Sequence, residues 1–131
     1  MERFPAGQAS QVGFELDAGN ARIGQFSGPG YRGCRLSGEI DFTSSGAVQS
    51  ALQAMILPGD GVVIADLSEV TFLDSSALGV LLQANRTATE QDTRLLVVAS
   101  EPVRKLLRLT GLDTVLASYD ELSAAEAAVS D

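Results

Sequence analysis

Residues 62–85, VVIADLSEVTFLDSSALGVLLQAN, constrain the fold more than any other stretch of the chain. The stretch opens with consecutive apolar residues, VVIA at 62–65, and the turn-forming triplet GDG at 59–61 precedes them. A short apolar run rich in β-branched residues, with a turn before it, is typical of a strand that is buried on both faces. We therefore expect a central strand to begin at Val62.

A polar break follows at Asp74, Ser75 and Ser76, and after it the spacing of the apolar residues changes. Leucines now recur at the i, i+3, i+4 spacing of one helix face: Leu78, Leu81 and Leu82. Asp and Ser directly before such a face are typical N-terminal caps, because their short side-chain oxygens accept hydrogen bonds from the free N–H groups of the first turn. The pattern predicts a helix over residues 77–90, and on chemistry alone the three polar residues need do no more than cap it. Its positive end would lie at the edge of the sheet, where partners and ligands meet α/β proteins.

Strand-like and helix-like patterns alternate through the rest of the chain. The expected strands are residues 12–17, 21–26, 31–37, 94–99 and 114–117, and the other helices are expected to begin near Ser45, near Ser100 and at Ser118 or Asp120. Such alternation requires crossover connections and parallel pairing, while the hairpin at the start makes the sheet mixed. We expect an α/β sandwich with a mixed sheet of about five strands and about four helices.

The N-terminal part of the chain has the weakest pattern. Residues 1–11 mix Pro, Gly, Gln and Ser without periodicity, and we expect them to form a flexible end. Residues 12–17 alternate weakly and fit either an extra edge strand or an ordered arm. No linker divides residues 12–131, which we expect to form a single domain.

The composition excludes several kinds of site. The chain of 131 residues contains no histidine, which removes the Ser-His-Asp and Cys-His arrangements, and its only cysteine, Cys34, excludes an intrachain disulfide. The net charge of −8 disfavours a nucleic-acid surface and adhesion to anionic lipid. No apolar run is long enough to span a bilayer and no secretory signal is visible, so we expect a cytoplasmic protein without stable membrane insertion.

Two groups of charged residues could serve as binding sites. Five carboxylates could gather near the sheet edge: Glu39, Asp41, Asp66, Glu69 and Asp74. We favour solvated charges and helix caps over a magnesium site there, and a zinc site would have one cysteine at best. A basic trio on one helix, Arg104, Lys105 and Arg108, is too small for nucleic acid and is expected to be a solvated face. The sequence therefore predicts neither a metal nor a cofactor.

Three motifs occur in a fixed order: GEID at residues 38–41, DLSEVTFLDSSALGVL at 66–81, and TGL at 110–112. Together they resemble the STAS (sulfate transporter and anti-sigma factor antagonist) domain family, and in particular its stand-alone bacterial anti-sigma factor antagonists. The resemblance covers residues 21–129. It implies a protein that binds an anti-sigma factor and thereby releases a sigma factor. It also places the family's first hairpin at residues 21–37.

The resemblance implies a role for individual residues. In this family the partner anti-sigma factor is a kinase that phosphorylates the serine directly after the aspartate, which is Ser75 here, and a phosphatase restores the free form. The partner surface would surround the start of the second helix: Asp41, Thr43, Asp74, Ser75, Ser76, Leu78 and Gly79. At Ala77 the family commonly has glycine, and a side chain at this position could obstruct a close partner or kinase.

Two other functions remain open on the sequence. The same fold could serve as an accessory subunit of a membrane transporter or of a stress-signalling assembly, without kinase switching. An enzyme with Ser75 as nucleophile is the least favoured of the three, because histidine, the usual base for such a serine, is absent from the chain. We therefore expect a binding protein and no enzyme.

Overall fold

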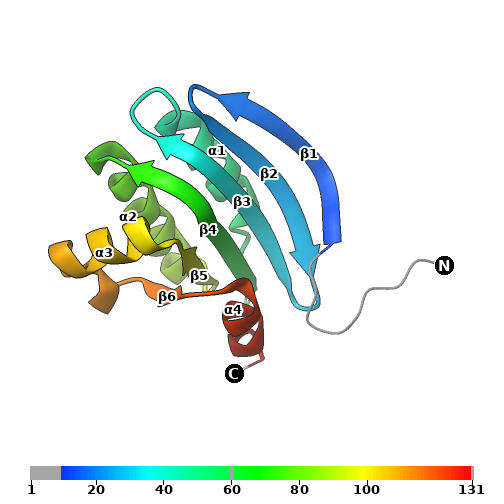
Figure 1. Cartoon of the computed structure of the whole chain (residues 1–131). Helices are drawn as coiled ribbons and strands as arrows, with labels where there is room; N and C mark the ends of the chain where they lie inside the picture. Colours follow the sequence, from blue (N-terminus) through cyan, green and yellow to red (C-terminus); the bar gives the residue numbers. More distant parts are fainter. Residues whose placement is uncertain (1–9, 60, 131) are drawn as a thin grey trace.

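The strand expected at Val62 lies inside a single sheet and is followed at once by a helix (Figure 1). The computed structural model describes residues 10–59 and 61–130. Its strands are β1 (Ser10–Ala18), β2 (Ala21–Gly28), β3 (Tyr31–Ile40), β4 (Val62–Leu73), β5 (Arg94–Ala99) and β6 (Ala117–Tyr119). Its helices are α1 (Ser45–Met55), α2 (Ser75–Glu90), α3 (Glu101–Thr110) and α4 (Leu122–Ala128), with a 3-10 turn, η1, at Leu112–Thr114.

The strands lie in the sheet in the order in which they occur in the chain, β1-β2-β3-β4-β5-β6. The pairs β1–β2 and β2–β3 are antiparallel, and the three pairs from β3 to β6 are parallel. This confirms the mixed α/β sheet. The described residues form six strands rather than about five, because residues 12–17 belong to a true edge strand, β1.

Alternate residues of the central strand pack into two separate hydrophobic cores, one on each face of the sheet. Val63, Ala65 and Leu67 of β4 face the larger core, which contains the buried sides of α1, α2 and α3. Ile64 faces the smaller core, where it meets Ala125 and Ala128 of α4. Burial on both faces explains the uninterrupted apolar run at the start of β4.

The expected leucine face of α2 is confirmed, and α1 buries one face in the same way. In α1, Val48, Leu52 and Met55 are buried, and Leu81 of α2 is only 1% exposed. Pro lies in the first turn of α3, and Gly111 ends this helix in the left-handed conformation at φ 77°. Glycine has no Cβ to clash there, which is why it suits this position.

Several boundaries differ from the sequence prediction. β4 continues past residue 65 to Leu73, and the last strand is Ala117–Tyr119 instead of residues 114–117. The last helix begins at Leu122, after an N-cap at Glu121, instead of at Ser118 or Asp120. β1 begins at Ser10, two residues before the expected domain boundary; the remainder of the expected flexible end, residues 1–9, lies outside the described residues.

Candidate functional site

Two helix starts meet at one end of the sheet, at the top of Figure 1. β3 and β4 are parallel neighbours, and their last residues, Ile40 and Leu73, lie opposite each other in the register. The backbone N–H of Asp74 donates to the carbonyl of Ile40 at 3.1 Å. The loop before α1 and the first turn of α2 are thus held side by side, as the parallel pairing predicts.

Asp74 caps α2. Its Oδ1 accepts the backbone N–H of Ala77 at 3.0 Å and the hydroxyl of Ser76 at 2.6 Å. The hydrogen bond from Ser76 is the largest cause of a lowered pKa for Asp74, followed by the bond from the Ala77 N–H, and the backbone N–H of Phe42 contributes as well. This carboxylate is therefore ionised and fixed at neutral pH.

Ser75 is the first residue of α2 and is exposed, whereas Ser76 is half-buried. Among the residues that the structure describes, nothing bonds to the Ser75 hydroxyl. This serine therefore has a free hydroxyl at a helix N-terminus, where a negative charge is electrostatically favoured. Within residues 10–59 and 61–130, no basic side chain is bonded to this hydroxyl.

Asp41 organises the loop that faces this serine. Its Oδ1 accepts both the backbone N–H of Thr43, at 2.9 Å, and the Thr43 hydroxyl, at 2.5 Å. Its backbone carbonyl accepts the N–H groups of Ser44 and Ser45. Ser44 occupies the N-cap position of α1 but makes no side-chain cap bond. The buried Ser44 hydroxyl bonds the backbone of Asp41 instead.

The remaining predicted site residues lie on the first turns of α2. Leu78 is half-buried and packs against the larger core, while Gly79 is exposed with open space around its Cα. Ala77 is 2% exposed and belongs to that core. Its methyl group therefore lies in the protein interior, and little of it is exposed to a partner.

Phe42 was missed by the sequence analysis. It lies between Asp41 and Thr43, and 77% of it is exposed. The available signal was an aromatic residue between the GEID motif and a helix start, where the helix-stripe pattern gives it no buried position.

The five carboxylates do not gather. Asp66 lies in the middle of β4, only 3% exposed, and its Oδ2 is 3.3 Å from Nε of Arg35. Asp66 is therefore neither at the sheet edge nor a solvated charge. Glu39 and Glu69 are exposed. Within residues 10–59 and 61–130, no group of three carboxylate, cysteine or histidine side chains is placed to hold a metal ion.

Comparison with known proteins identifies the family of this fold. Residues 33–118 match the model of the family described as "Mlab, STAS domain". The chain belongs to the STAS domain family. The resemblance to STAS-domain anti-sigma factor antagonists is confirmed.

Relatives of this STAS domain have been named as regulators. It is 31% identical over 88 residues to an anti-sigma F factor antagonist of Paenibacillus polymyxa, covering 66% of this chain and 75% of the relative. It is 29% identical over 82 residues to an anti-sigma-B factor antagonist of Listeria monocytogenes, covering 62% and 72%. The crystal structure of an anti-sigma factor antagonist from Mycobacterium paratuberculosis superposes with a TM-score of 0.73 at 28% identity, covering 88% of this chain and all of that one, 100%.

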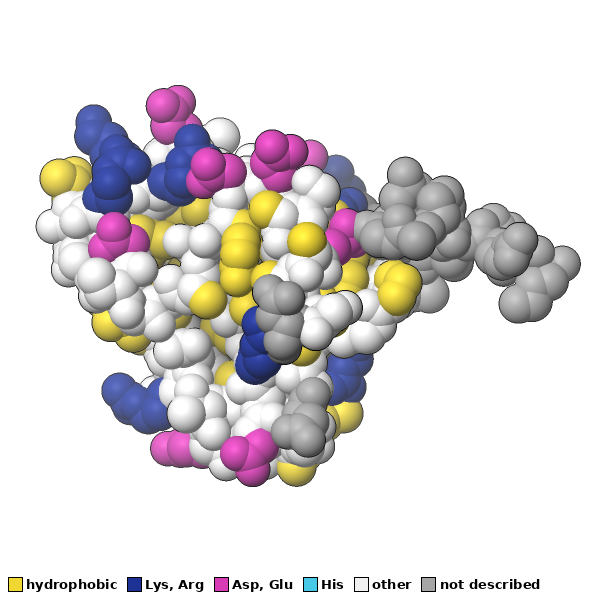
Figure 2. Space-filling model, turned by 90° about the horizontal axis from the view of Figure 1, so that it is seen from below, with side chains coloured by type: hydrophobic (Ala, Val, Ile, Leu, Met, Phe, Trp, Pro, Cys, Tyr) yellow, Lys and Arg dark blue, Asp and Glu magenta, His cyan; other side chains and the backbone are white. Residues whose placement is uncertain are grey.

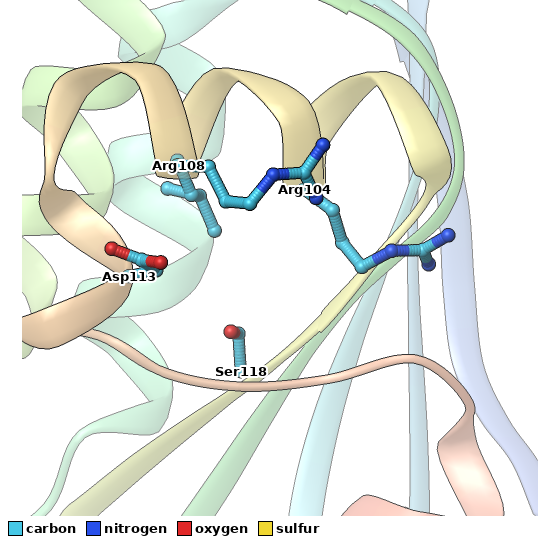
Figure 3. Close-up of a pocket in the computed structure, with 5 residues that line it drawn as sticks. Arg104, Arg108, Asp113 and Ser118 are labelled. Carbon is cyan, nitrogen blue, oxygen red and sulfur yellow. The ribbon is translucent and has the colours of Figure 1, made fainter.

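A small cavity of about 150 Å³ lies elsewhere in this STAS domain, between α3, η1 and β6 (Figure 3). Arg104 and Arg108 lie along α3, with Asp113 and Ser118 on the other side. Arg104 already bonds the carbonyl of Ala99 at 3.0 Å and lies 3.5 Å from Asp120. The cavity contains none of the predicted site residues. It therefore does not compete with the α2 start as the functional site.

The view from below shows the end of this STAS domain away from the α2 start, where acidic and basic side chains both lie around the periphery (Figure 2). The charge there is mixed, and no extended basic face is visible in this view. For the described part of the chain, no helix has the length and apolar character needed to cross a membrane.

Proposed function

We propose that this STAS domain is an anti-sigma factor antagonist whose binding to an anti-sigma factor kinase releases a sigma factor and is switched off by phosphorylation of Ser75. The observation that carries the proposal is the pair of adjacent serines at the start of α2. Ser76 is engaged with Asp74, while Ser75 is exposed and has a free hydroxyl. A kinase can therefore reach the Ser75 hydroxyl without breaking a hydrogen bond of the fold.

The helix start can accept the added phosphate. A phosphoserine carries about −1.5 to −2 charges at neutral pH. The positive end of the α2 dipole favours such an anion, so we expect phosphorylation to leave the domain folded. A phosphatase returns the protein to the binding form.

The partner surface that we propose is formed by the loop before α1 and the first turns of α2, which meet beside Ser75. It comprises Asp41, Thr43, Asp74, Ser75, Ser76, Leu78 and Gly79. The Asp74–Ile40 backbone bond and the Asp41–Thr43 bonds support this proposal, because they keep both loops in one arrangement before binding. A preorganised surface loses less conformational entropy on association. The protein acts by binding and not as an enzyme, in the cytoplasm.

The test uses the full chain with the purified anti-sigma kinases of the source cell and ATP. We expect a gain of one phosphate by intact mass, located on Ser75 by peptide mapping. Ser75→Ala should remain unmodified, and the matched variant Ser76→Ala should still accept phosphate. Phosphate on Ser76 would contradict the assignment. No phosphate from any anti-sigma kinase, together with copurification of a transporter subunit, would favour the accessory-subunit function instead.

A further inference from the structure

We propose that Phe42 is the apolar anchor of the interface with the anti-sigma partner, and that it enters an apolar pocket of that partner whose rim carries basic side chains. The inference rests on the proposed function and names the contact that binding depends on. It adds a residue that lies outside the surface predicted from the sequence.

Phe42 is exposed on a loop that is held in place. Its side chain is 77% exposed, the highest fraction among the exposed large apolar residues in the described part of the chain. The residues on either side of it, Asp41 and Thr43, are joined by two hydrogen bonds to the same carboxylate oxygen. A large apolar side chain displayed on a fixed turn loses little freedom on binding and removes much apolar surface from water. Aromatic residues are enriched in protein interfaces for this reason.

The turn between β1 and β2 packs against this loop and acts as a brace that limits its movement. Gly19 has a φ of +60°, and a Cβ added to it would lie 2.3 Å from Oγ1 of Thr43. The carbonyl of Asn20 accepts the backbone N–H of Glu39 at 3.2 Å. Figure 1 shows this turn at the same end of the sheet as the loop before α1. β1 and β2 lie outside the residues matched by the family model, 33–118, so this brace belongs to the part of the chain that the match does not cover.

Phe42 is also adjacent to the proposed switch. Its backbone N–H contributes to the lowered pKa of Asp74, the residue directly before Ser75. A phosphate on Ser75 would bring strongly hydrated oxygens next to the apolar contact. Burying Phe42 against the partner would then require removing water from that phosphate, which is costly for a charged group. Phosphorylation and the loss of binding are thereby connected through one contact.

Acidic groups surround Phe42 on this end of the molecule. Glu39 is exposed, and Asp41 and Asp74 are partly exposed. Complementary charge on a partner orients the encounter and accelerates association. The rim of the partner pocket is therefore basic.

The test measures the affinity of the full chain for the purified anti-sigma kinase by calorimetry. Phe42→Ala should bind at least about tenfold more weakly, which corresponds to about 1.4 kcal/mol. Its melting temperature should equal that of the wild type, because the side chain is exposed. The matched control is Leu109→Ala: Leu109 is 75% exposed on α3 and should leave the affinity unchanged.

A second pair of variants tests the brace. Gly19→Ala forces a methyl group against Thr43, and we expect weaker binding. Gly111→Ala introduces similar backbone strain, at φ +77°, in a place where nothing lies within 4 Å of the added atom. It should bind as the wild type does at a temperature at which both variants are folded. Added salt should slow the association of the wild type, as a basic rim requires.

The outcomes separate the two proposals. If Phe42→Ala binds like the wild type while Ser75 is still phosphorylated, the anchor is refuted and the proposed function stands. If Leu109→Ala weakens binding as much as Phe42→Ala, the effect is not specific to this surface and the anchor is again refuted. A wild-type chain that binds no anti-sigma kinase overturns both. An association rate that does not respond to salt refutes the basic rim.

Discussion

Ser76 donates its hydroxyl hydrogen to Oδ1 of Asp74 across 2.6 Å, and this bond separates the roles of two adjacent serines. The bond keeps the Ser76 side chain as part of the helix cap. Ser75, whose side chain forms no such bond within the described residues, remains available for modification. The sequence alone could not divide the pair, because either side chain is suited to a cap.

Ser75→Asp should fold normally and bind the anti-sigma partner much more weakly. Two like unit charges about 6 Å apart, at an effective dielectric constant of about 20, repel by about 3 kcal/mol before salt screening. One acidic group on the partner would thus weaken binding by tens- to about a hundredfold. Titration calorimetry measures this, with Ser75→Asn as a neutral variant of the same shape. Equal affinities for Asp and Asn at this position would contradict the charge argument.

Asp74 should make stability fall in acid. Its pKa is lowered in the fold from the ordinary value of 3.8, chiefly by the Ser76 hydrogen bond. A lowered pKa means that the ionised form stabilises the fold above 3.8, and that this contribution is lost as the pH falls through the folded pKa. The melting temperature of the wild type should therefore exceed that of Asp74→Asn at neutral pH, and the difference should shrink below pH 3.8.

An NMR titration gives a second check on the same bond. Ser76→Ala removes the main cause of the lowered pKa of Asp74, so the titration of this carboxyl should move up toward 3.8. An unchanged titration in Ser76→Ala would show that the hydroxyl bond does not form in solution.

Leu81→Ala should destabilise the domain by about 2–5 kcal/mol, as truncations of buried leucines do. Leu81 is 1% exposed and lies in the larger core, so the substitution leaves a cavity between α2 and the sheet. Urea unfolding measures the loss. Gln83→Ala is the matched control, since Gln83 is exposed on the same helix and should change little. A small effect at Leu81 would show that α2 packs with another face.

Arg35→Met should cost about 1–3 kcal/mol, because it leaves a buried carboxylate without its cationic partner. Asp66 is 3% exposed, and Nε of Arg35 lies 3.3 Å from its Oδ2. The guanidinium also lies 4.7 Å from the centre of the Phe26 ring. Chemical denaturation of the variant should show the loss, and combining it with Asp66→Asn should recover part of it. Full additivity of the two substitutions would mean that the ion pair contributes nothing.

Local sequence patterns were sufficient to predict strands and buried helix faces where the periodicity of apolar residues is strong. Residues 94–99 were predicted with both ends correct, and the α2 stripe placed Leu81 in the core. They failed at residues 114–117, where an apolar run resembles a strand. The Thr114 hydroxyl bonds the carbonyl of Gly111 at 2.8 Å in a tight turn, and pairing with β5 begins only at Ala117. Pairing between distant segments, which the local pattern does not contain, decides that boundary.

The site was predictable to the extent that chain topology brings it together. Asp41 and Asp74 follow parallel strands, and such ends meet at one edge of a sheet. Asp66 was misplaced because β4 continues beyond it, so its side chain is buried in the middle of the strand. The exposure of Phe42 could not be predicted, because the exposed fraction of a loop residue depends on which other segments cover the loop. The binding roles of the predicted residues remain predictions.

In the described sheet, each strand after β1 pairs with the strand that precedes it in the chain. During synthesis from the N-terminus, each new strand can therefore pair with the edge of the sheet that has already formed. No later strand has to insert between two earlier ones. Contacts that are close in sequence form faster than distant ones. The domain should accordingly begin to fold during synthesis, with the β1–β3 sheet complete before the helix that carries Ser75 has been made.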